Sequence, residues 1–402
     1  MRSIFVNGLK QKPIEEQNFE IVERKGLGHP DSICDGIMND VSIELSREYL
    51  NRVGRILHHN ADKSLLVAGK TEVRFGGGVV EEPMLLVLGD RATFEIGDIK
   101  IPVEEIAVET AKNWIKNHLR YVDPIEHMRY QVELKPGSAE LTDIFFRKDR
   151  VLDANDTSAA VGYAPMSETE KMVLSLEKWL NSKEFKERFP ETGEDIKVMG
   201  FRKNRDLNLV VSMAFVDQFI NSEEEYFIKK EEILSEIENF VNRSESFECV
   251  NVALNTLDER GKGTSGVYLT VLGTSADGAD SGQVGRGNRV NGVIPLNRPV
   301  CSEAAAGKNP VSHVGKIYNL LTHRIAEDIY RQVDSVIEVY VWLLSKIGQP
   351  IDQPMVAVAQ IITEESCTVK DVERRVREII EFELDNIEDF CMELASGKIS
   401  VY

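Results

Sequence analysis

The sequence predicts an α+β protein built from three similar α/β units, each with one sheet covered by helices. The chain has 402 residues, too many for one ordinary domain core, which suggests two or three domains. The same order of predicted elements, helix, two strands, helix and strand, occurs three times along the chain. Two long segments between these repeats, 135–165 and 273–311, fit no helix or strand pattern.

We expect the long helices to interleave the units. The expected boundaries, in chain order, are residues 1–30 and 51–135 with a helix over 31–50, residues 136–260 with a helix over 166–184, and residues 261–402 with the Gly-rich segment 273–311.

Each unit is predicted to begin with a helix whose apolar residues mark a core-facing stripe. The stripes are Ile33, Ile37, Val41 and Leu45; Met172, Val173, Leu176, Trp179 and Leu180; and Ile317, Leu320, Leu321, Ile325 and Ile329. The second helix also has a start signal, because Ser167 and Glu170 form the S-x-x-E pattern of a capping box.

Two strand-like runs, a helical run and a third strand are predicted after each of these helices. In the first unit they are LLVAGKTEVRF, MLLVLG, VEEIAVETAKNWIKNHL and MRYQVEL. In the second they are IKVMGF, LNLVVSMAFV, IKKEEILSEIENFVN and FECVNVALN. In the third they are VIEVYVWLL, MVAVAQIIT, TVKDVERRVREIIEFEL and the short tail ISVY.

Composition limits the partners. Apolar residues make up 42% and charged residues 29% of the chain, and 67 acids against 48 bases give a net charge of −19. Such a surface repels nucleic acid and anionic membrane, so we expect neither as a partner. Five cysteines without a CxxC pair argue against disulfides or zinc and fit a reducing cytoplasm. We expect no signal peptide and no membrane span.

The Gly-rich segment 273–311 has almost no hydrophobic period, and a loop of this length is either functional or disordered. Its varied composition and isolated apolar residues favour function. Glycines expose backbone N–H groups, and Arg286, Arg289, Arg298 and Lys308 supply cations, so we predict an anion cradle. The alternative is a mobile surface loop with solvated charges. The GKNP run at Lys308 lacks the frame of a Walker A motif.

Carboxylates among small residues form a second group of candidates. Asp277 and Asp280 lie in the Gly-rich segment, and Asp153 and Asp156 lie in DANDTS. Such groups can bind ribose hydroxyls, an ammonium or magnesium, but they also commonly close Asx turns. The sequence leaves both interpretations open.

The stretch Gly28-His29-Pro30-Asp31 precedes the first helix. Pro30 suits a first helical turn, so Asp31 and His29 can be an ordinary cap and loop residue. A proton donor and a metal-type acid held rigid by proline are also what an active site at a helix mouth needs. The run from His58 to Lys63 is similarly polar, and equally consistent with a strand edge.

Four motifs in this order resemble the S-adenosylmethionine synthetase family, in its archaeal-type branch, over essentially the whole chain. They are GHPD, DANDTSAAVGYAPMSETE, GADSGQVGRGNR and AAAGKNP. The resemblance implies three α/β domains about a pseudo-threefold axis and a homodimer with active sites at the subunit interface. It also implies that the sulfur of L-methionine attacks ribose C5′ of ATP, and that the released triphosphate is cleaved to pyrophosphate and phosphate.

The resemblance assigns roles to individual residues. It implies that His29 stabilises charge on the leaving oxygen, that Asp31 binds magnesium, and that Arg286 and Lys308 contact the triphosphate. Further contacts to methionine, nucleotide or phosphate are implied for Asp156, Asp280, Gly282, Lys203 (with Arg202 as an equal candidate), Gly137 and Ser138.

Departures from the commoner branch affect the cations. Ser32 follows GHPD where that branch has a lysine, and His313 and Gly315 stand where it has a second lysine and a second metal acid. The resemblance implies two magnesium ions, of which the second has no assigned ligand, and it leaves potassium open. The rival hypotheses are a non-Walker ATPase or kinase and a non-catalytic nucleotide-binding module.

Overall fold

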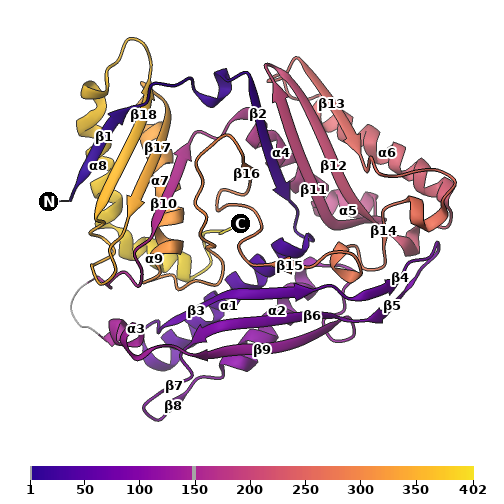
Figure 1. The fold of residues 1–402 in the computed structure, drawn as a ribbon, viewed down its shortest axis with the longest axis horizontal. Coiled ribbons are helices and arrows are strands. Elements are labelled where there is room, and N and C mark those ends of the chain that lie inside the picture. The colour runs from indigo at the N-terminus through magenta and orange to yellow at the C-terminus, as the bar shows by residue number, and fades with distance from the viewer. Residues whose placement is uncertain (1, 147–150) are drawn as a thin grey trace.

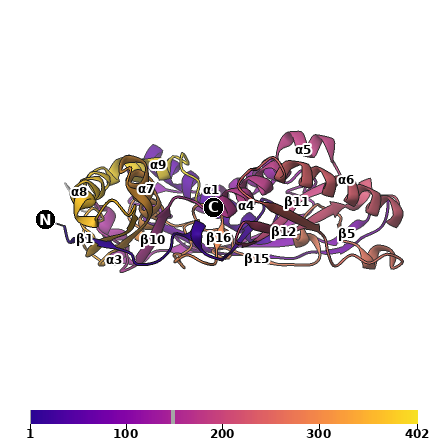
Figure 2. The same ribbon diagram turned by 90° about the horizontal axis from the view of Figure 1, so that it is seen from above.

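The computed structural model describes residues 2–146 and 151–402 of the chain. Figure 1 shows three sheets around a central region that contains β16 (Ile294–Pro295) and the end of the chain at residue 402. Seen from above in Figure 2, helices α5, α6, α7, α8 and α9 lie on one side and strands such as β1, β10 and β15 on the other. Each sheet therefore has one face covered by helices.

The first sheet has the order β15-β3-β6-β9, and α1 and α2 pack on it. Its elements are β15 (Gly282–Gln283), β3 (His59–Val67), β6 (Met84–Ala92), β9 (Met128–Pro136), α1 (Pro30–Val53) and α2 (Val103–His118). Two small hairpins extend from this region: β4 (Lys70–Glu72) with β5 (Val79–Glu82), and β7 (Glu95–Ile96) with β8 (Ile99–Lys100).

The second sheet has the order β13-β12-β11-β2-β16, with β14 also paired to β12. Its strands are β13 (Cys249–Leu254), β12 (Asp206–Val216), β11 (Thr192–Lys203), β2 (Phe19–Lys25), β16 and β14 (Leu269–Thr270). The helices that accompany it are α4 (Glu168–Leu180), α5 (Lys183–Arg188) and α6 (Glu223–Val241).

The third sheet has the order β1-β18-β17-β10. Its elements are β1 (Ile4–Gly8), β18 (Val356–Thr363), β17 (Val336–Leu344), β10 (Ala159–Ala164), α7 (Val314–Gln332), α8 (Val369–Asp385) and α9 (Ile387–Ala395). The described residues also form a short helix α3 (Ala139–Asp143) and five 3-10 helices: Ile14–Glu16, Ile144–Phe146, Asp217–Phe219, Gly263–Gly266 and Ser275–Asp277.

All three sheets share one pairing pattern. A central antiparallel hairpin, β3–β6, β11–β12 or β17–β18, has a parallel strand beside its second member and an antiparallel strand beside its first. The parallel strands are β9, β13 and β1, and the antiparallel ones are β15, β2 and β10. The mixed α/β architecture that the sequence predicts is confirmed.

Several segments lie outside the unit predicted for them. The tail ISVY is not a strand. Its expected place beside β18 is taken by β1, and β2 lies in the second sheet beside β11. Likewise β10 pairs with β17 rather than with the second unit, and Gly282–Gln283 pair with β3 of the first. An apolar run predicts a strand but not its partner, which can come from any part of the chain.

The helix start signals are confirmed. Ser167 and Glu170 form a complete capping box at α4. The helix expected over 166–184 is, however, interrupted after Leu180, because the Ser182 side chain accepts a hydrogen bond from Phe185 N and begins α5.

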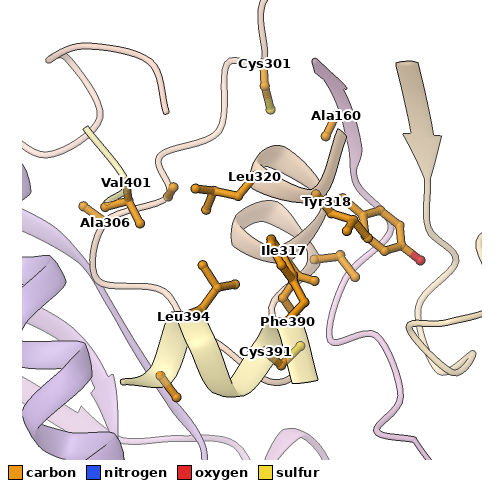
Figure 3. Close-up of a cluster of buried hydrophobic side chains, with 14 of the residues drawn as sticks. Ala160, Cys301, Ala306, Ile317, Tyr318, Leu320, Phe390, Cys391, Leu394 and Val401 are labelled. Atoms are coloured by element: carbon orange, nitrogen blue, oxygen red, sulfur yellow. The ribbon is translucent and has the colours of Figure 1, made fainter. Parts of the chain in front are cut away.

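The core joins the last helices to the centre of the molecule. Figure 3 shows Ile317 and Leu320 of α7 packed near Leu394 of α9, with Val401 beside Ala306. Val401 is only 4% exposed, so the tail contributes core packing instead of a strand. Cys301 and Cys391 also lie in this core, and all five cysteines are unpaired. Among the described residues, no helix has the length and apolar character needed to cross a bilayer.

Candidate active site

The mouth of α1 brings His29 and Asp31 together. His29 is the N-cap of the helix, and its Nδ1 accepts a hydrogen bond from Asp31 N at 3.2 Å. Asp31 Oδ1 accepts from Gln283 N at 2.9 Å, and its Oδ2 accepts from the Lys25 ammonium, also at 2.9 Å. The helix mouth therefore lies directly against the Gly-rich segment and the end of β2, which makes the expected pair His29–Asp31 part of one polar cluster.

Glycines allow this close approach. A Cβ atom on Gly28 would lie 2.5 Å from Asp195 N, and one on Gly282 would lie 2.1 Å from the carbonyl oxygen of Pro30. Both obstacles are backbone atoms, which cannot move aside as a side chain can.

We expect Gly282→Ala to displace the Gly-rich segment from the helix mouth, reducing activity sharply and destabilising the fold by about 1–3 kcal/mol. Gly8→Ala is the matched control, because its Cβ would meet only a methyl group of Val369, at 3.0 Å. Melting temperature and product formation measure the two effects. Wild-type values for Gly282→Ala would contradict the close-approach argument.

Asp195 is a site residue that the sequence analysis missed. It lies near the start of β11, is buried, and its Oδ2 accepts hydrogen bonds from Ser275 N at 2.8 Å and Ser275 Oγ at 2.5 Å. Burial raises the pKa of Asp195, and the facing His29 and Ser275 oppose that rise.

The protonation of His29 follows from its surroundings. Burial lowers the pKa of His29, and the carboxylates of Asp195, Asp31 and Asp280 oppose this only in part. The imidazole is therefore neutral near pH 7. Because its Nδ1 accepts the N–H of Asp31, the proton lies on Nε2, where it can be donated to a ligand.

One face of α1 continues from this cluster. Asp35 Oδ1 accepts from Gly285 N at 2.8 Å, one turn beyond Asp31, and Asn39 Oδ1 accepts from the Lys316 ammonium at 3.2 Å, one turn further. Eight helical residues span about 12 Å. The helix thus connects the His29 cluster to a second cluster around Lys308.

Burial raises the pKa of Asp35 to about 7, although the N–H groups of Gly285 and Gly287 act in the opposite direction. The native state therefore holds this proton more tightly than the unfolded chain does. Its contribution to stability is complete below about pH 4 and is lost as the pH rises to about 7.

We accordingly expect the melting temperature of Asp35→Asn, relative to wild type, to increase between pH 5 and pH 8. The amide stays neutral throughout, whereas wild type loses the contribution of its proton. Thermal unfolding at both pH values measures the difference. A difference that does not change with pH would show that Asp35 is already ionised at pH 5.

Lys308 forms the second cluster. Its ammonium contacts Asp62 Oδ2 and lies 3.1 Å from Glu303 Oε2, and the side chains of Lys308 and Asp62 are only 4% and 3% exposed. Burial alone would raise the pKa of Asp62, but Lys308 outweighs it and holds this pKa well below its usual range. His313, the N-cap of α7, lies nearby as a neutral group, because burial lowers its pKa to about 3.

The other expected site residues are distributed around these clusters. Arg286 is exposed, and its carbonyl oxygen accepts from the Lys25 ammonium at 2.6 Å. Asp280 is exposed and close enough to His29 to affect its pKa. Asp156 is also exposed, and the preceding Asn155 N donates to Ser312 O at 3.2 Å, beside the start of α7.

Gly137 and Ser138 lie where β9 turns into α3. A Cβ on Gly137 would lie 2.4 Å from His58 Nδ1, so packing against that ring alone explains this glycine. Ser138 is exposed at the N-cap of α3, and its hydroxyl makes no capping hydrogen bond.

Lys203 and Arg202 are not brought to these clusters. Lys203 is the last residue of β11, eight residues beyond Asp195 and hence about 26 Å away along the strand. Arg202 is buried and paired with Glu20 at 3.2 Å.

Two of the arginines expected in the anion cradle have structural roles instead. Arg298 is 1% exposed and ion-paired with Glu170 at 3.0 Å. Arg289 donates to the carbonyl groups of Gly285 and Gly287 and so stabilises the loop itself. The Nη groups of both arginines are therefore engaged by other groups of the protein.

Comparison with known proteins shows the family of the chain. The family model for S-adenosylmethionine synthetase (AdoMet synthetase) matches residues 2–398. The chain belongs to the S-adenosylmethionine synthetase family. Its relatives include the S-adenosylmethionine synthases of Methanothrix thermoacetophila and Pyrococcus furiosus, each 46% identical over 100% of both chains. A probable S-adenosylmethionine synthase of Aquifex aeolicus is 43% identical over 96% of each chain.

A solved structure resembles the fold. It is that of an unusual S-adenosylmethionine synthetase from Campylobacter jejuni, with a TM-score of 0.61, 16% identity and 94% of each chain covered. At this level of identity the similarity supports the architecture, while the family membership rests on the full-length relatives.

Proposed function

We propose that the chain synthesises S-adenosylmethionine from ATP and L-methionine, by attack of the methionine sulfur on ribose C5′. The triphosphate leaves whole and is then hydrolysed to pyrophosphate and phosphate. Full-length similarity to synthases that carry this name supports the reaction. The observation that carries the mechanism is the position of His29 at the mouth of α1, where Asp31 N donates to its Nδ1 at 3.2 Å and so places the ring proton on Nε2.

The chain needs no general base for this step. A thioether sulfur has no proton to lose, so catalysis comes from alignment of sulfur with C5′ and from stabilising negative charge on the leaving oxygen. His29 donates to that oxygen. Asp195, which is held by Ser275, is close enough to His29 to affect its pKa and favours positive charge on the imidazole.

Triphosphate cleavage depends on cations. Lys308 and Arg286 are proposed to hold the phosphates and to stabilise charge in phosphoryl transfer. In the ligand-free structure, Lys308 is ion-paired with Asp62 and Glu303, and these two contacts hold its ammonium next to the start of α7.

Asp31 is proposed to bind magnesium, which supplies charge neutralisation on the phosphates when bound. The described residues offer no cluster of three or more His, Cys, Asp or Glu side chains suited to a metal. Magnesium often takes one or two carboxylates and completes its shell with substrate phosphates and water, so Asp31 is proposed as one protein ligand among these. A second magnesium ion and potassium are proposed by family analogy, without assigned ligands.

The remaining assignments are proposed contacts to substrates. Asp156 is proposed to bind methionine, and Asp280, Gly282, Gly137 and Ser138 to contact the nucleotide. Lys203 lies far from His29 of its own chain, so a phosphate contact from it requires a second subunit.

We propose a homodimer with active sites at the interface. The uncovered sheet faces support it, because they expose apolar side chains over two sheets, including Leu65, Val67, Phe201 and Val210. We also propose three domains about a pseudo-threefold axis, supported by their shared strand pairing. We propose the domain boundaries that the sequence predicts, with four exceptions. Strands β1 and β10 are assigned to the third domain, β2 to the second and β15 to the first. A cytoplasmic location is proposed, consistent with five unpaired cysteines.

Mass spectrometry of the products tests the proposal. Purified protein incubated with ATP, L-methionine and magnesium should yield S-adenosylmethionine, pyrophosphate and phosphate in equal amounts. ATP turnover that continues at the same rate without methionine would favour the rival ATPase. A protein that binds ATP but forms no product would be a nucleotide-binding module.

A further inference from the structure

We infer that Lys25 is an exchangeable cation of the active site. In the ligand-free protein its ammonium holds Asp31, and when a divalent cation binds Asp31 the ammonium is released to the triphosphate. The inference rests on the proposed function. It begins from two contacts of the Lys25 Nζ atom, 2.9 Å to Asp31 Oδ2 and 2.6 Å to the carbonyl oxygen of Arg286.

Lys25 and a metal ion must compete for the same oxygen atom. Asp31 Oδ1 already accepts the backbone N–H of Gln283 at 2.9 Å, a contact that fastens the Gly-rich segment to the helix mouth. Oδ2 is bound by Lys25. A divalent cation therefore reaches Oδ2 only if the ammonium leaves, since two cations on one oxygen repel each other strongly.

The structure fixes the base of the Lys25 side chain and leaves its tip free to exchange. Asn288 binds the Lys25 backbone on both sides: its Oδ1 accepts from Lys25 N at 2.9 Å, and its Nδ2 donates to Lys25 O at 2.7 Å. The Lys25 side chain is 14% exposed, and the contact of its ammonium with the Arg286 carbonyl oxygen lies at the protein surface. A lysine carries a compact charge on a flexible four-carbon stem, which suits a change of partner.

Charge balance makes this ammonium necessary when a polyanion binds. Asp31 and the exposed Asp280 both lie close enough to His29 to affect its pKa, and their negative charges would repel a triphosphate. Lys25 contacts Asp31 directly. A displaced Lys25 ammonium stays within reach of the same mouth and becomes a phosphate ligand.

The inference predicts effects of opposite sign in one variant. We expect Lys25→Met to bind magnesium alone about tenfold more tightly, because the competitor for Asp31 is gone. We expect the same variant to bind tripolyphosphate, in saturating magnesium, at least about tenfold more weakly, because a charge-assisted hydrogen bond is lost. Isothermal titration calorimetry measures both, and Lys25→Arg should restore most of the tripolyphosphate affinity.

Lys197→Met is the matched control. Lys197 lies directly across from Lys25 in the β11–β2 pairing, is paired with Glu23 at 3.1 Å and is 42% exposed, so its loss removes the same charge nearby. We expect both affinities of this variant to remain at wild-type values.

The inference is overturned if Lys25→Met changes both affinities in the same direction or neither of them, while Lys197→Met behaves as wild type. Failure of the proposed function is a separate result, because it would appear as a wild-type protein that forms no S-adenosylmethionine. The two binding measurements require no turnover and remain decisive in either case.

Discussion

We expect His29→Ala to slow the formation of S-adenosylmethionine in a single turnover by about 100-fold or more. The imidazole donates its Nε2 proton to the oxygen that acquires negative charge as the triphosphate leaves, and one contact of this kind is worth about 10²–10³ in rate. ATP affinity should change much less, because the contact strengthens only in the transition state. Rapid quench with saturating ATP and methionine measures the rate.

The structural role of His29 requires a control. The alanine also loses the N-cap contact to Asp31 N, which costs about 0.5–2 kcal/mol of stability. Asparagine is a favoured N-cap residue but lacks the imidazole, so His29→Asn should keep the wild-type melting temperature and still be slow. If His29→Asn reacts at the wild-type rate, the assigned proton donor is wrong.

The second large effect is expected for Lys308→Met. Triphosphate hydrolysis should fall at least about 100-fold, because the ammonium that stabilises phosphoryl transfer is gone. The variant should also be destabilised by up to about 3 kcal/mol, because Asp62 loses its buried partner and keeps the contact of its Oδ1 with the exposed Lys63 ammonium at 2.6 Å. Hydrolysis of added tripolyphosphate and thermal unfolding report the two losses separately.

A second substitution distinguishes these effects. Asp62→Asn added to Lys308→Met removes the buried charge that has lost Lys308 and should recover most of the melting temperature, while tripolyphosphate hydrolysis stays low. Recovery of hydrolysis together with stability would mean that Lys308 supports the fold and does not act on phosphate.

The fold was predictable wherever a local pattern determines it. The capping box of Ser167 and Glu170, the apolar stripe of α7 and the strand runs of the three hairpins are local signals, and the structure contains all of them. The positions of β1 and of the tail were not predictable, because a strand's partner depends on packing far away in the sequence. Val401 packs into the core beside Ala306.

The candidate site was predictable in its motifs and incomplete in its partners. Gly28 to Asp31 and Gly282 have local signatures, and the structure brings them together. The sequence around Asp195 contains no motif that marks this residue as part of a site, since an acid at the start of a strand is usually solvated. Lys25 stands four residues before His29 but faces Asp31 only because the chain folds back at Gly28.

Arg298 and Arg289 show what composition does not report. Arg298 and Arg289 were candidates for phosphate because they lie in the Gly-rich segment. The structure engages Arg298 with the buried Glu170 and Arg289 with carbonyl groups of its own loop. The sequence shows which charged residues are present but not which of them are already engaged by other groups of the protein.

The central claim is that the chain transfers an adenosyl group and releases triphosphate intact before any phosphate bond breaks. Rapid quench of one turnover, with S-adenosylmethionine, triphosphate, pyrophosphate and phosphate measured in each sample, tests it most directly. The account predicts that S-adenosylmethionine and enzyme-bound triphosphate appear together, followed by pyrophosphate and phosphate. Phosphate or pyrophosphate that appears before S-adenosylmethionine would contradict it.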